Sequence, residues 1–348
     1  MGASLPLALD AMGGDNAPGE IIAGARAAVD ELGVGITLVG RPERIAAAPE
    51  SEGMNLGDTA FEGPALGDTA GGGISVHPAS EVIAMDADGA RAVRRMKDSS
   101  LVRAAELVRD GKASAMISAG NTGATVASAL LRMGRIKGVS RPAVATPIPV
   151  PGSTPTVLLD AGAMADCQPS WLAQFAQMGS VYATKRFGID EPRVGLLSIG
   201  EEASKGNQLT KEAHARLVET PGINFIGNVE GRDIMTDGVD VVVTDGFTGN
   251  VVLKTLEGGL KAMVAAVLEA LASEPQTLGL LAPLATQMDP DTYGGAMLLG
   301  VDGVCIISHG SSGRQAVVNA MRVARDMVEA DLVGALAARI TPEPTSRS

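Results

Sequence analysis

Short apolar runs alternate along the chain with longer segments in which apolar residues recur every three or four positions, and glycine-rich polar turns follow the runs. The runs have the length of β-strands, and the longer segments have the period of amphipathic helices. Strands separated by helices favour a parallel sheet, because parallel neighbours need a crossover connection. The sequence therefore predicts an α/β protein with an open, mostly parallel sheet and helices on both faces. The predicted strands are residues 5–9, 35–39, 115–118, 144–150, 156–159, 193–199, 224–226 and 241–243, with two short strands after residue 295.

Residues 240–254 read DVVVTDGFTGNVVLK, and we expect the chain to be organised around them. An apolar strand ends in a glycine turn, and a helix-like pattern begins directly after it. The first backbone N–H groups of such a helix point beyond the sheet edge, where an anion can bind them. Residues 115–126, AMISAGNTGATV, repeat this design. Turns of this kind also need Gly and Asn for backbone reasons alone. The pair favours one shared anion site, but it does not name a reaction.

Other polar turns follow further predicted strands. In open parallel sheets, ligands bind outside the carboxyl ends of the strands. We therefore expect one cleft to gather these turns, namely residues 10–15, 121–123, 160–162, 205–207, 245–250 and 309–312.

Composition excludes several classes of function. The net charge of −12 and an aromatic content of 2% argue against a nucleic-acid partner, which needs cationic and stacking side chains. Two widely spaced cysteines and three histidines form no zinc or disulfide pattern, so we predict neither a metal nor a cofactor. The N-terminus shows no secretory signal, and no apolar stretch reaches the ~20 residues of a membrane span. We predict a cytoplasmic protein that at most touches a membrane surface.

We predict one domain over residues 1–340 and a frayed tail over 341–348. Residues 49–73 are rich in Gly, Asp and Pro and carry LGDTA twice, which is typical of an exposed insertion. Residues 275–288 form an apolar helical element without a charge. Two interpretations of this element stay open, a subunit interface and contact with a lipid bilayer.

Two basic groups stand out in this acidic chain, within residues 91–103 and 132–141. Each is either a solvated helix face or a docking surface for an acidic partner or a phosphate group. The candidate docking residues are Arg94, Arg95 and Lys97 in the first group and Arg132, Arg135 and Lys137 in the second.

Several motifs occur in order over nearly the whole chain: LDAMGGDNAP, SAGNTGA, GRIKGVSRPA, LLDAGA, GEEASKGN, FIGNVEGRDI, DVVVTDGFTGNVVLK, YGGAMLLGVDG and SHGSS. Together they resemble the bacterial family of acyl-carrier-protein:phosphate acyltransferases of phospholipid synthesis. Asn16, Met164 and Met297 replace the His, Asn and Pro that are usual in the family. The resemblance implies an isocitrate/isopropylmalate dehydrogenase-like architecture and a homodimer. It also implies transfer of a long-chain acyl group from acyl carrier protein to inorganic phosphate. The product would feed a glycerol-3-phosphate acyltransferase at the membrane.

On this resemblance we assign roles to the polar turns. Asn121, Thr122 and Gly123 would hold phosphate from one side, and Thr248, Gly249 and Asn250 from the other. Lys205 would neutralise charge on the phosphate or the oxyanion, and Asp245 or His309 would take the remaining proton. Catalytic candidates are thus Lys205, Asp245, His309 and Asn250. Further substrate-binding candidates are Asp10, Gly13, Gly14, Asn207, Gly246, Ser311 and Ser312.

Three other functions compete with this interpretation. A coenzyme A-dependent phosphate acetyl- or butyryltransferase would use the same chemistry with another thiol. A metal- and NAD-dependent decarboxylating dehydrogenase would need converging Asp residues, and no GxGxxG motif follows a strand with the expected downstream acid. A regulator that binds acyl carrier protein without catalysis would not need so many polar strand-end turns.

Overall fold

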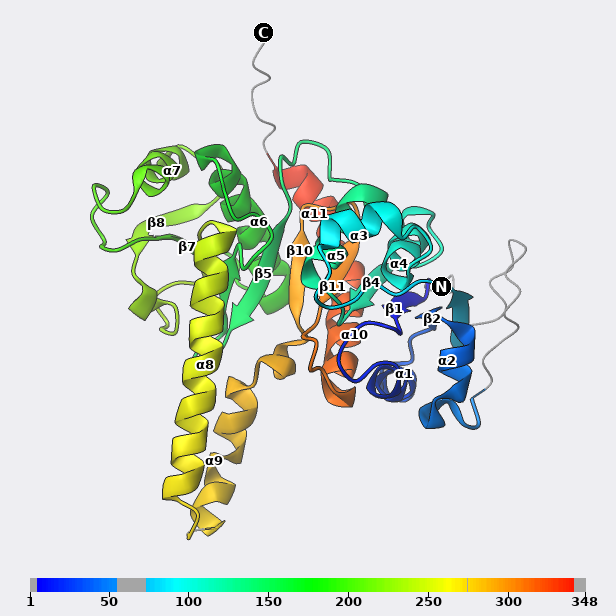
Figure 1. Ribbon diagram of the computed structural model, residues 1–348. Helices are drawn as coiled ribbons and strands as arrows, with labels where there is room; N and C mark the ends of the chain where they lie inside the picture. Colours follow the sequence, from blue (N-terminus) through cyan, green and yellow to red (C-terminus); the bar gives the residue numbers. More distant parts are fainter. Residues whose placement is uncertain (1–4, 55–72, 274, 341–348) are drawn as a thin grey trace. The chain divides into compact units, whose positions relative to one another are not determined.

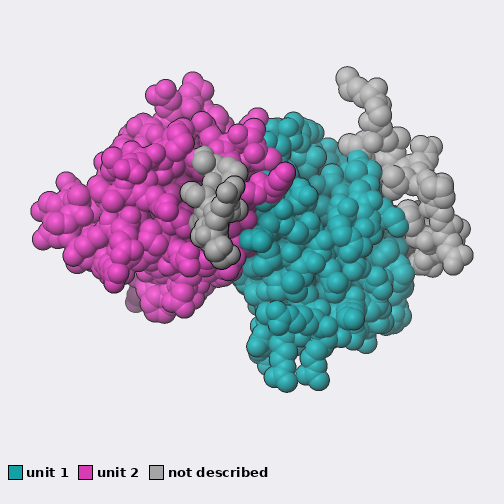
Figure 2. All heavy atoms as spheres, turned by 90° about the horizontal axis from the view of Figure 1, so that it is seen from above, with its two compact units in different colours: residues 1–136, 293–334 teal, residues 137–292, 335–348 magenta. Residues whose placement is uncertain are grey.

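The computed structural model describes residues 5–54, 73–273 and 275–340 (Figure 1). The chain divides into two compact units, which Figure 2 shows in different colours. Unit 1 comprises residues 1–136 and 293–334, and unit 2 comprises residues 137–292 and 335–348. Residues 55–72 of the predicted insertion and the predicted tail 341–348 lie outside the described residues. The single domain over 1–340 stays a prediction.

Unit 1 is built on a sheet whose strands lie in the order β3-β2-β1-β4-β11-β10. All neighbours that we describe here are parallel except β10 and β11. Figure 1 shows α1 and α10 on one face of this sheet and α3, α4 and α5 on the other. The strands are β1 (Leu7–Asp10), β2 (Ile36–Gly40), β3 (Ile74–Pro78), β4 (Ala115–Ser118), β10 (Ala296–Leu299) and β11 (Val304–Ile307). The helices are α1 (Gly19–Leu32), α2 (Pro42–Ala47), α3 (Gly89–Arg95), α4 (Ser100–Arg109), α5 (Thr122–Ser128) and α10 (Arg314–Glu329).

The strands of unit 2 lie in the order β5-β6-β9-β7-β8 and are parallel except for the pair β5 and β6. The strands are β5 (Ala143–Ile148), β6 (Thr156–Leu159), β7 (Arg193–Leu197), β8 (Asn224–Val229) and β9 (Val241–Val243). The helices are α6 (Pro169–Phe187), α7 (Gln208–Val218), α8 (Gly246–Ala270) and α9 (Pro275–Met288), and α11 (Leu332–Arg339) follows α10. Short turns of other helix types are η1 (Pro49–Ser51), η2 (Ala129–Met133), η3 (Gly231–Asp233) and η4 (Pro290–Tyr293).

These parallel strands and covering helices confirm the predicted fold class. The cores contain Val, Ile, Leu, Ala and Met with few aromatic side chains, and the glycines let layers approach closely. Gly179 of α6 is an example, because a Cβ atom there would lie 2.6 Å from the Cγ1 atom of Val241 in β9. The helix can therefore lie directly on the strand that leads into the central turn of unit 2.

Helices α8 and α9 run side by side away from the sheet of unit 2 (Figure 1). α9 covers the same residues as the predicted apolar element. Among the described residues, no helix combines the length and hydropathy that crossing a bilayer requires.

Two glycine substitutions test this close packing. Gly24 of α1 lies against α10, and a Cβ atom there would be 2.5 Å from the Cβ atom of Val317. Gly24→Ala should therefore lower the free energy of unfolding by roughly 1–3 kcal/mol through overpacking. Gly258→Ala in α8 is the matched control, since a Cβ atom there would have nothing within 4 Å. It should raise that free energy by about 0.5–1 kcal/mol, because Ala restricts the unfolded chain. Urea unfolding of both variants measures the difference, and effects of the same sign would contradict the packing.

Candidate functional site

Three turns of unit 1 meet at the carboxyl ends of neighbouring parallel strands. β1 and β11 both pair with β4, so the residues after all three strands share one sheet edge. The backbone N–H of Asp15 donates to the carbonyl oxygen of Gly310 over 2.7 Å. A Cβ atom at Gly13 would lie 2.7 Å from the nitrogen of Gly120. Glycine is thus required at Gly13 for this close approach.

Asp10 holds these turns together from inside. Its carboxylate is buried and accepts hydrogen bonds from the Ser118 hydroxyl at 2.7 Å and the Met12 N–H at 3.1 Å. Burial raises the pKa of Asp10, and the hydrogen bonds from Ser100, Ser118 and the backbone oppose that rise. The carboxylate is enclosed by the turns that it connects. Contact between Asp10, Gly13 or Gly14 and a substrate stays a prediction.

Both polar atoms of the Asn121 side-chain amide form hydrogen bonds with the backbone. Its Oδ1 atom accepts a hydrogen bond from the Ala124 N–H at 2.9 Å and so caps α5. Its Nδ2 group donates to the carbonyl oxygens of Met85 at 2.8 Å and Ala87 at 2.9 Å. Asn121 therefore positions the turn and the segment before α3. Thr122 and Gly123 are exposed beside it and accessible to a ligand.

The turn after β11 carries His309, Ser311 and Ser312. Ser311 is exposed and His309 is half-buried. The hydroxyls of Ser308 and Ser312 are buried, and neither has a hydrogen-bond partner among the described residues. Ser308 is absent from the sequence-based candidates, although SHGSS contains it. Both hydroxyls are thus buried donors whose role stays open to a test by substitution.

Asp160 organises the corresponding turn of unit 2, where β6 and β7 both pair in parallel with β9. Its buried carboxylate accepts hydrogen bonds from four backbone N–H groups. These belong to Val144 at 2.9 Å, Gly162 at 3.0 Å, Ala163 at 2.9 Å and Met164 at 2.7 Å. Burial raises the pKa of Asp160, and these four N–H groups counteract the rise. The sequence places Asp160 in a strand-end turn but assigns no role to its side chain.

The first turn of α8 lies directly on the Asp160 turn. A Cβ atom at Gly249 would overlap the carbonyl oxygen of Asp160, and one at Gly246 would lie 2.7 Å from its Oδ2 atom. The N–H of Gly246 donates to the Met164 carbonyl oxygen over 2.8 Å. Asn250 is exposed, and its Cγ atom would be 3.6 Å from a Cβ atom at Gly162. Both glycines are therefore needed for the position of the α8 N-terminus.

Asp245 caps this helix. Its Oδ1 atom accepts a hydrogen bond from the Thr248 N–H, and its Oδ2 atom accepts one from the Thr248 hydroxyl, each at 2.8 Å. A carboxylate at a helix N-terminus is favoured by the helix dipole. Thr248 is thus held by Asp245, and a role for Asp245 as proton acceptor stays a prediction.

Lys205 and Asn207 lie in the loop between β7 and α7. Asn207 caps α7, because its Oδ1 atom accepts hydrogen bonds from the N–H and the hydroxyl of Thr210 at 2.9 Å and 3.0 Å. Asn228, from the FIGNVEGRDI motif, donates to the Glu202 carbonyl oxygen over 2.9 Å and so holds the loop. The side chain of Lys205 is exposed and crosses Gly200, and its ammonium has no partner among the described residues. Its charge is therefore available for an anion.

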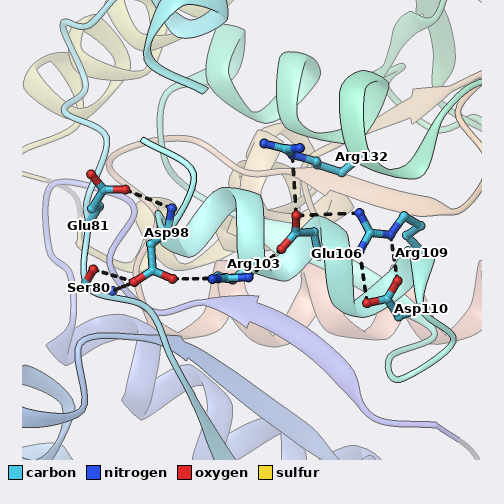
Figure 3. A network of polar contacts seen from close by, with 8 residues as sticks. All are labelled: Ser80, Glu81, Asp98, Arg103, Glu106, Arg109, Asp110 and Arg132. Atoms are coloured by element: carbon cyan, nitrogen blue, oxygen red, sulfur yellow. Dashed lines mark hydrogen bonds and ion pairs between the residues drawn. The ribbon is translucent and has the colours of Figure 1, made fainter. Parts of the chain in front are cut away.

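In unit 1 the structure brings the turns after β1, β4 and β11 into contact, and in unit 2 it packs the first turn of α8 on the Asp160 turn. Lys205 and Asn207 lie after the neighbouring strand β7, and the predicted grouping of all these turns in one cleft stays a prediction. The described residues contain no cluster of three or more His, Cys, Asp or Glu side chains able to hold a metal ion. Of the docking candidates, Arg94, Arg95 and Lys97 are exposed, as are Arg135 and Lys137. Arg132 lies 3.8 Å from a carboxylate oxygen of Glu106 in a polar network (Figure 3).

Residues 5–334 match the family model described as fatty acid synthesis protein. The chain belongs to this family. It is 47% identical to the phosphate acyltransferase of Desulforamulus reducens over 338 residues, which cover 95% of this chain and 96% of that protein. The resemblance to phosphate acyltransferases is thereby confirmed.

Solved structures of more distant proteins share the fold of this family member. The phosphotransacetylase of Streptococcus pyogenes matches with a TM-score of 0.61 at 18% identity, over 94% of this chain and 95% of that one. The 4-hydroxythreonine-4-phosphate dehydrogenase of Klebsiella pneumoniae matches with a TM-score of 0.55 at 14% identity, over 93% and 100%. At these identities the likeness concerns the fold alone.

Alkylation of Cys167 tests whether the thiol near the Asp160 turn is reactive. Burial and the nearby charge of Asp160 raise the pKa of Cys167 to about 12. At about pH 8 the thiol is protonated, and the thiolate fraction should be on the order of a thousandfold lower than in the unfolded chain. We expect iodoacetamide to modify Cys167 slowly in the folded protein and rapidly in urea, as followed by peptide mass spectrometry. A native rate equal to the unfolded rate would contradict this environment and make Cys167 a candidate acyl acceptor.

Proposed function

We propose that this protein transfers a long-chain fatty acyl group from acyl carrier protein to inorganic phosphate and so forms acyl phosphate. The proposal is carried by the first turn of α8, which is fixed on Asp160 and presents the exposed Asn250 and the half-buried Thr248, in a chain of this family. In unit 1, the Asn121–Gly123 turn is the corresponding candidate for phosphate binding. The wider candidate set is Asp10, Gly13, Gly14, Asn207, Gly246, Ser311 and Ser312.

The chemistry makes modest demands on the protein. A phosphate oxygen forms a bond to the acyl carbon, the carbon–sulfur bond breaks, and the thiolate leaves and takes up a proton. Phosphate is already anionic near neutral pH, with a second pKa of roughly 6–7, and a thiol of pKa ~8.5 leaves readily. Fixed dipoles and positioning can therefore supply most of the rate enhancement. Lys205 neutralises the developing charge, Asn250 orients the phosphate, and Asp245 or His309 takes the remaining proton.

A coenzyme A-dependent phosphate acetyl- or butyryltransferase is the second candidate. Its support is the shared fold with the phosphotransacetylase of Streptococcus pyogenes. The two candidates differ in the thiol carrier, because the phosphate and the acyl transfer step are common to both.

Turnover with two carriers decides between the candidates. The wild-type protein is given inorganic phosphate with palmitoyl acyl carrier protein or with palmitoyl- and acetyl-coenzyme A, and acyl phosphate is trapped with hydroxylamine. We expect phosphate-dependent product with preference for the carrier protein. Product from short coenzyme A esters alone would overturn the proposal in favour of the second candidate.

Replacement of Lys205 tests the proposed charge neutralisation. Lys205→Ala should lower kcat by roughly a hundredfold or more, because a preorganised cation at the developing charge is lost. Lys211→Ala in α7 is the matched control, since Lys211 is also exposed and has no assigned role. Turnover near that of the wild type for Lys205→Ala would remove this residue from the site.

The second part of the proposal concerns the α8–α9 arm. Residues 261–270 of α8 are all exposed, and only Lys261 and Glu269 among them carry charge. In α9, Leu280 is 80% exposed and Leu284 is 46% exposed. An apolar surface of this kind favours burial. We propose that a second copy of the chain covers the arm in a homodimer that acts in the cytoplasm. Peripheral contact of the arm with a membrane is the competing interpretation, and either arrangement would release acyl phosphate for a glycerol-3-phosphate acyltransferase.

The double variant Leu280→Asp, Leu284→Asp separates a subunit interface from membrane contact. We expect the wild type to be dimeric by light scattering and the variant to dissociate at micromolar concentration, since two charges would enter an apolar interface. Co-sedimentation with liposomes is measured in parallel. A variant that stays dimeric but loses liposome binding would contradict the dimer proposal for this surface and support membrane contact.

A further inference from the structure

Two sets of basic residues in unit 1 differ in their partners: the Glu106 network and the α3 set. In the Glu106 network, Arg103 donates to Asp98 at 2.7 Å and to Glu106 at 2.9 Å, and Arg109 donates to Asp110 at 2.7 Å. Arg132 lies 3.8 Å from Glu106. Figure 3 shows these side chains joined in one network. Their charges are balanced by carboxylates within the same unit, so little net attraction is left for a partner.

The α3 set lies on α3 and directly after it. Arg91, Arg94, Arg95 and Lys97 are exposed, and their side chains have neither a hydrogen bond nor an ion pair with the described residues. Val93 is buried, so the helix is anchored by its apolar side and presents its charges to solvent. Four unbalanced positive charges on seven consecutive residues are unusual in a chain of net charge −12. Such a local patch attracts an acidic surface.

Helix α3 packs tightly against the Gly120–Gly123 turn, without space for a side chain between them. A Cβ atom at Gly89 would overlap the nitrogen of Ala124 and the carbonyl carbon of Gly123. Asn121 donates hydrogen bonds to the carbonyl oxygens of Met85 and Ala87, which lie just before the helix. A partner bound on α3 would therefore have a fixed position relative to the turn that carries Thr122 and Gly123.

We infer that the exposed face of α3, with Arg91, Arg94, Arg95 and Lys97, is the docking surface for an acidic carrier protein that presents the acyl thioester. The inference rests on the proposed function and assigns docking to the candidates Arg94, Arg95 and Lys97, together with Arg91. Asn121 and Gly89 act as positioning residues, because they connect the docked carrier to the phosphate turn. The balanced network around Glu106 supports α4 and takes no part in docking.

Charge reversal tests this surface. Arg94→Glu with Arg95→Glu should raise the KM for acyl carrier protein roughly tenfold at about 50 mM salt and less than about threefold at about 500 mM, while kcat is retained. The matched control is Lys211→Glu with Arg216→Glu, which changes the net charge equally on the exposed face of α7 in unit 2. The control should change the KM less than about twofold. An equal rise in both variants would overturn the inference, since it would show an effect of net charge alone.

A second substrate and a binding assay separate docking from folding and from catalysis. The uncharged thioester palmitoyl-N-acetylcysteamine needs no protein docking, so both variants should use it at the wild-type rate. Binding of unacylated holo acyl carrier protein, measured by calorimetry, should weaken only in the α3 variant. Unchanged carrier binding in that variant would overturn the inference. Failure of the wild type to use any acylated carrier would instead overturn the proposed function, and the two failures are therefore distinguishable.

Discussion

The carboxylate of Asp160, hydrogen-bonded to four backbone N–H groups, is the interaction on which the rest of the unit 2 site depends. It folds residues 161–164 into a compact turn, and the first turn of α8 rests on that turn through Gly246 and Gly249. Hydrogen bonds to a charged group are each stabilising by about 1.5–3 kcal/mol, so four of them define a rigid support. The position of Thr248 and Asn250 follows from this support, because Gly249 has no room for a side chain.

Unit 1 uses a buried aspartate in a related way. Asp10 also follows the apolar residues of its strand, and it also fixes glycine turns on neighbouring strands, although its partners include the hydroxyl of Ser118. In both units the buried carboxylate is turned inward and hydrogen-bonded, while Thr122, Asn250 and Lys205 are exposed at the turns. This arrangement suits an anionic substrate, since the buried carboxylates are already hydrogen-bonded and these exposed hydroxyl, amide and ammonium groups can donate hydrogen bonds.

The sequence predicts the parallel sheet and its glycine turns because both depend on local patterns. Strand β3 (Ile74–Pro78) was not predicted, since it follows residues 55–72, where the periodic pattern is lost. The hydrogen bonds from Val144 to Asp160 and from Asn228 to Glu202 cannot be predicted in this way, because the partners are 16 and 26 residues apart in the sequence. The other N–H groups on Asp160 belong to residues 162–164, but a local pattern does not show that the carboxylate turns inward to accept them. The same limit applies to the basic groups. Arg132 and Arg94 look alike in the sequence, and only the position of Glu106 shows that Arg132 lies beside a carboxylate.

Phosphate binding measured by calorimetry tests the central claim most directly, namely that the close approach of α8 to Asp160 builds the anion site. Gly249→Ala and Gly259→Ala make the same change in one helix, but a Cβ atom at Gly249 overlaps the Asp160 carbonyl oxygen and one at Gly259 has nothing within 4 Å. The account predicts that Gly249→Ala weakens phosphate binding by roughly tenfold or more, which is about 1.4 kcal/mol or more, while Gly259→Ala binds as the wild type does. Equal phosphate affinity in the two variants, both folded, would contradict it.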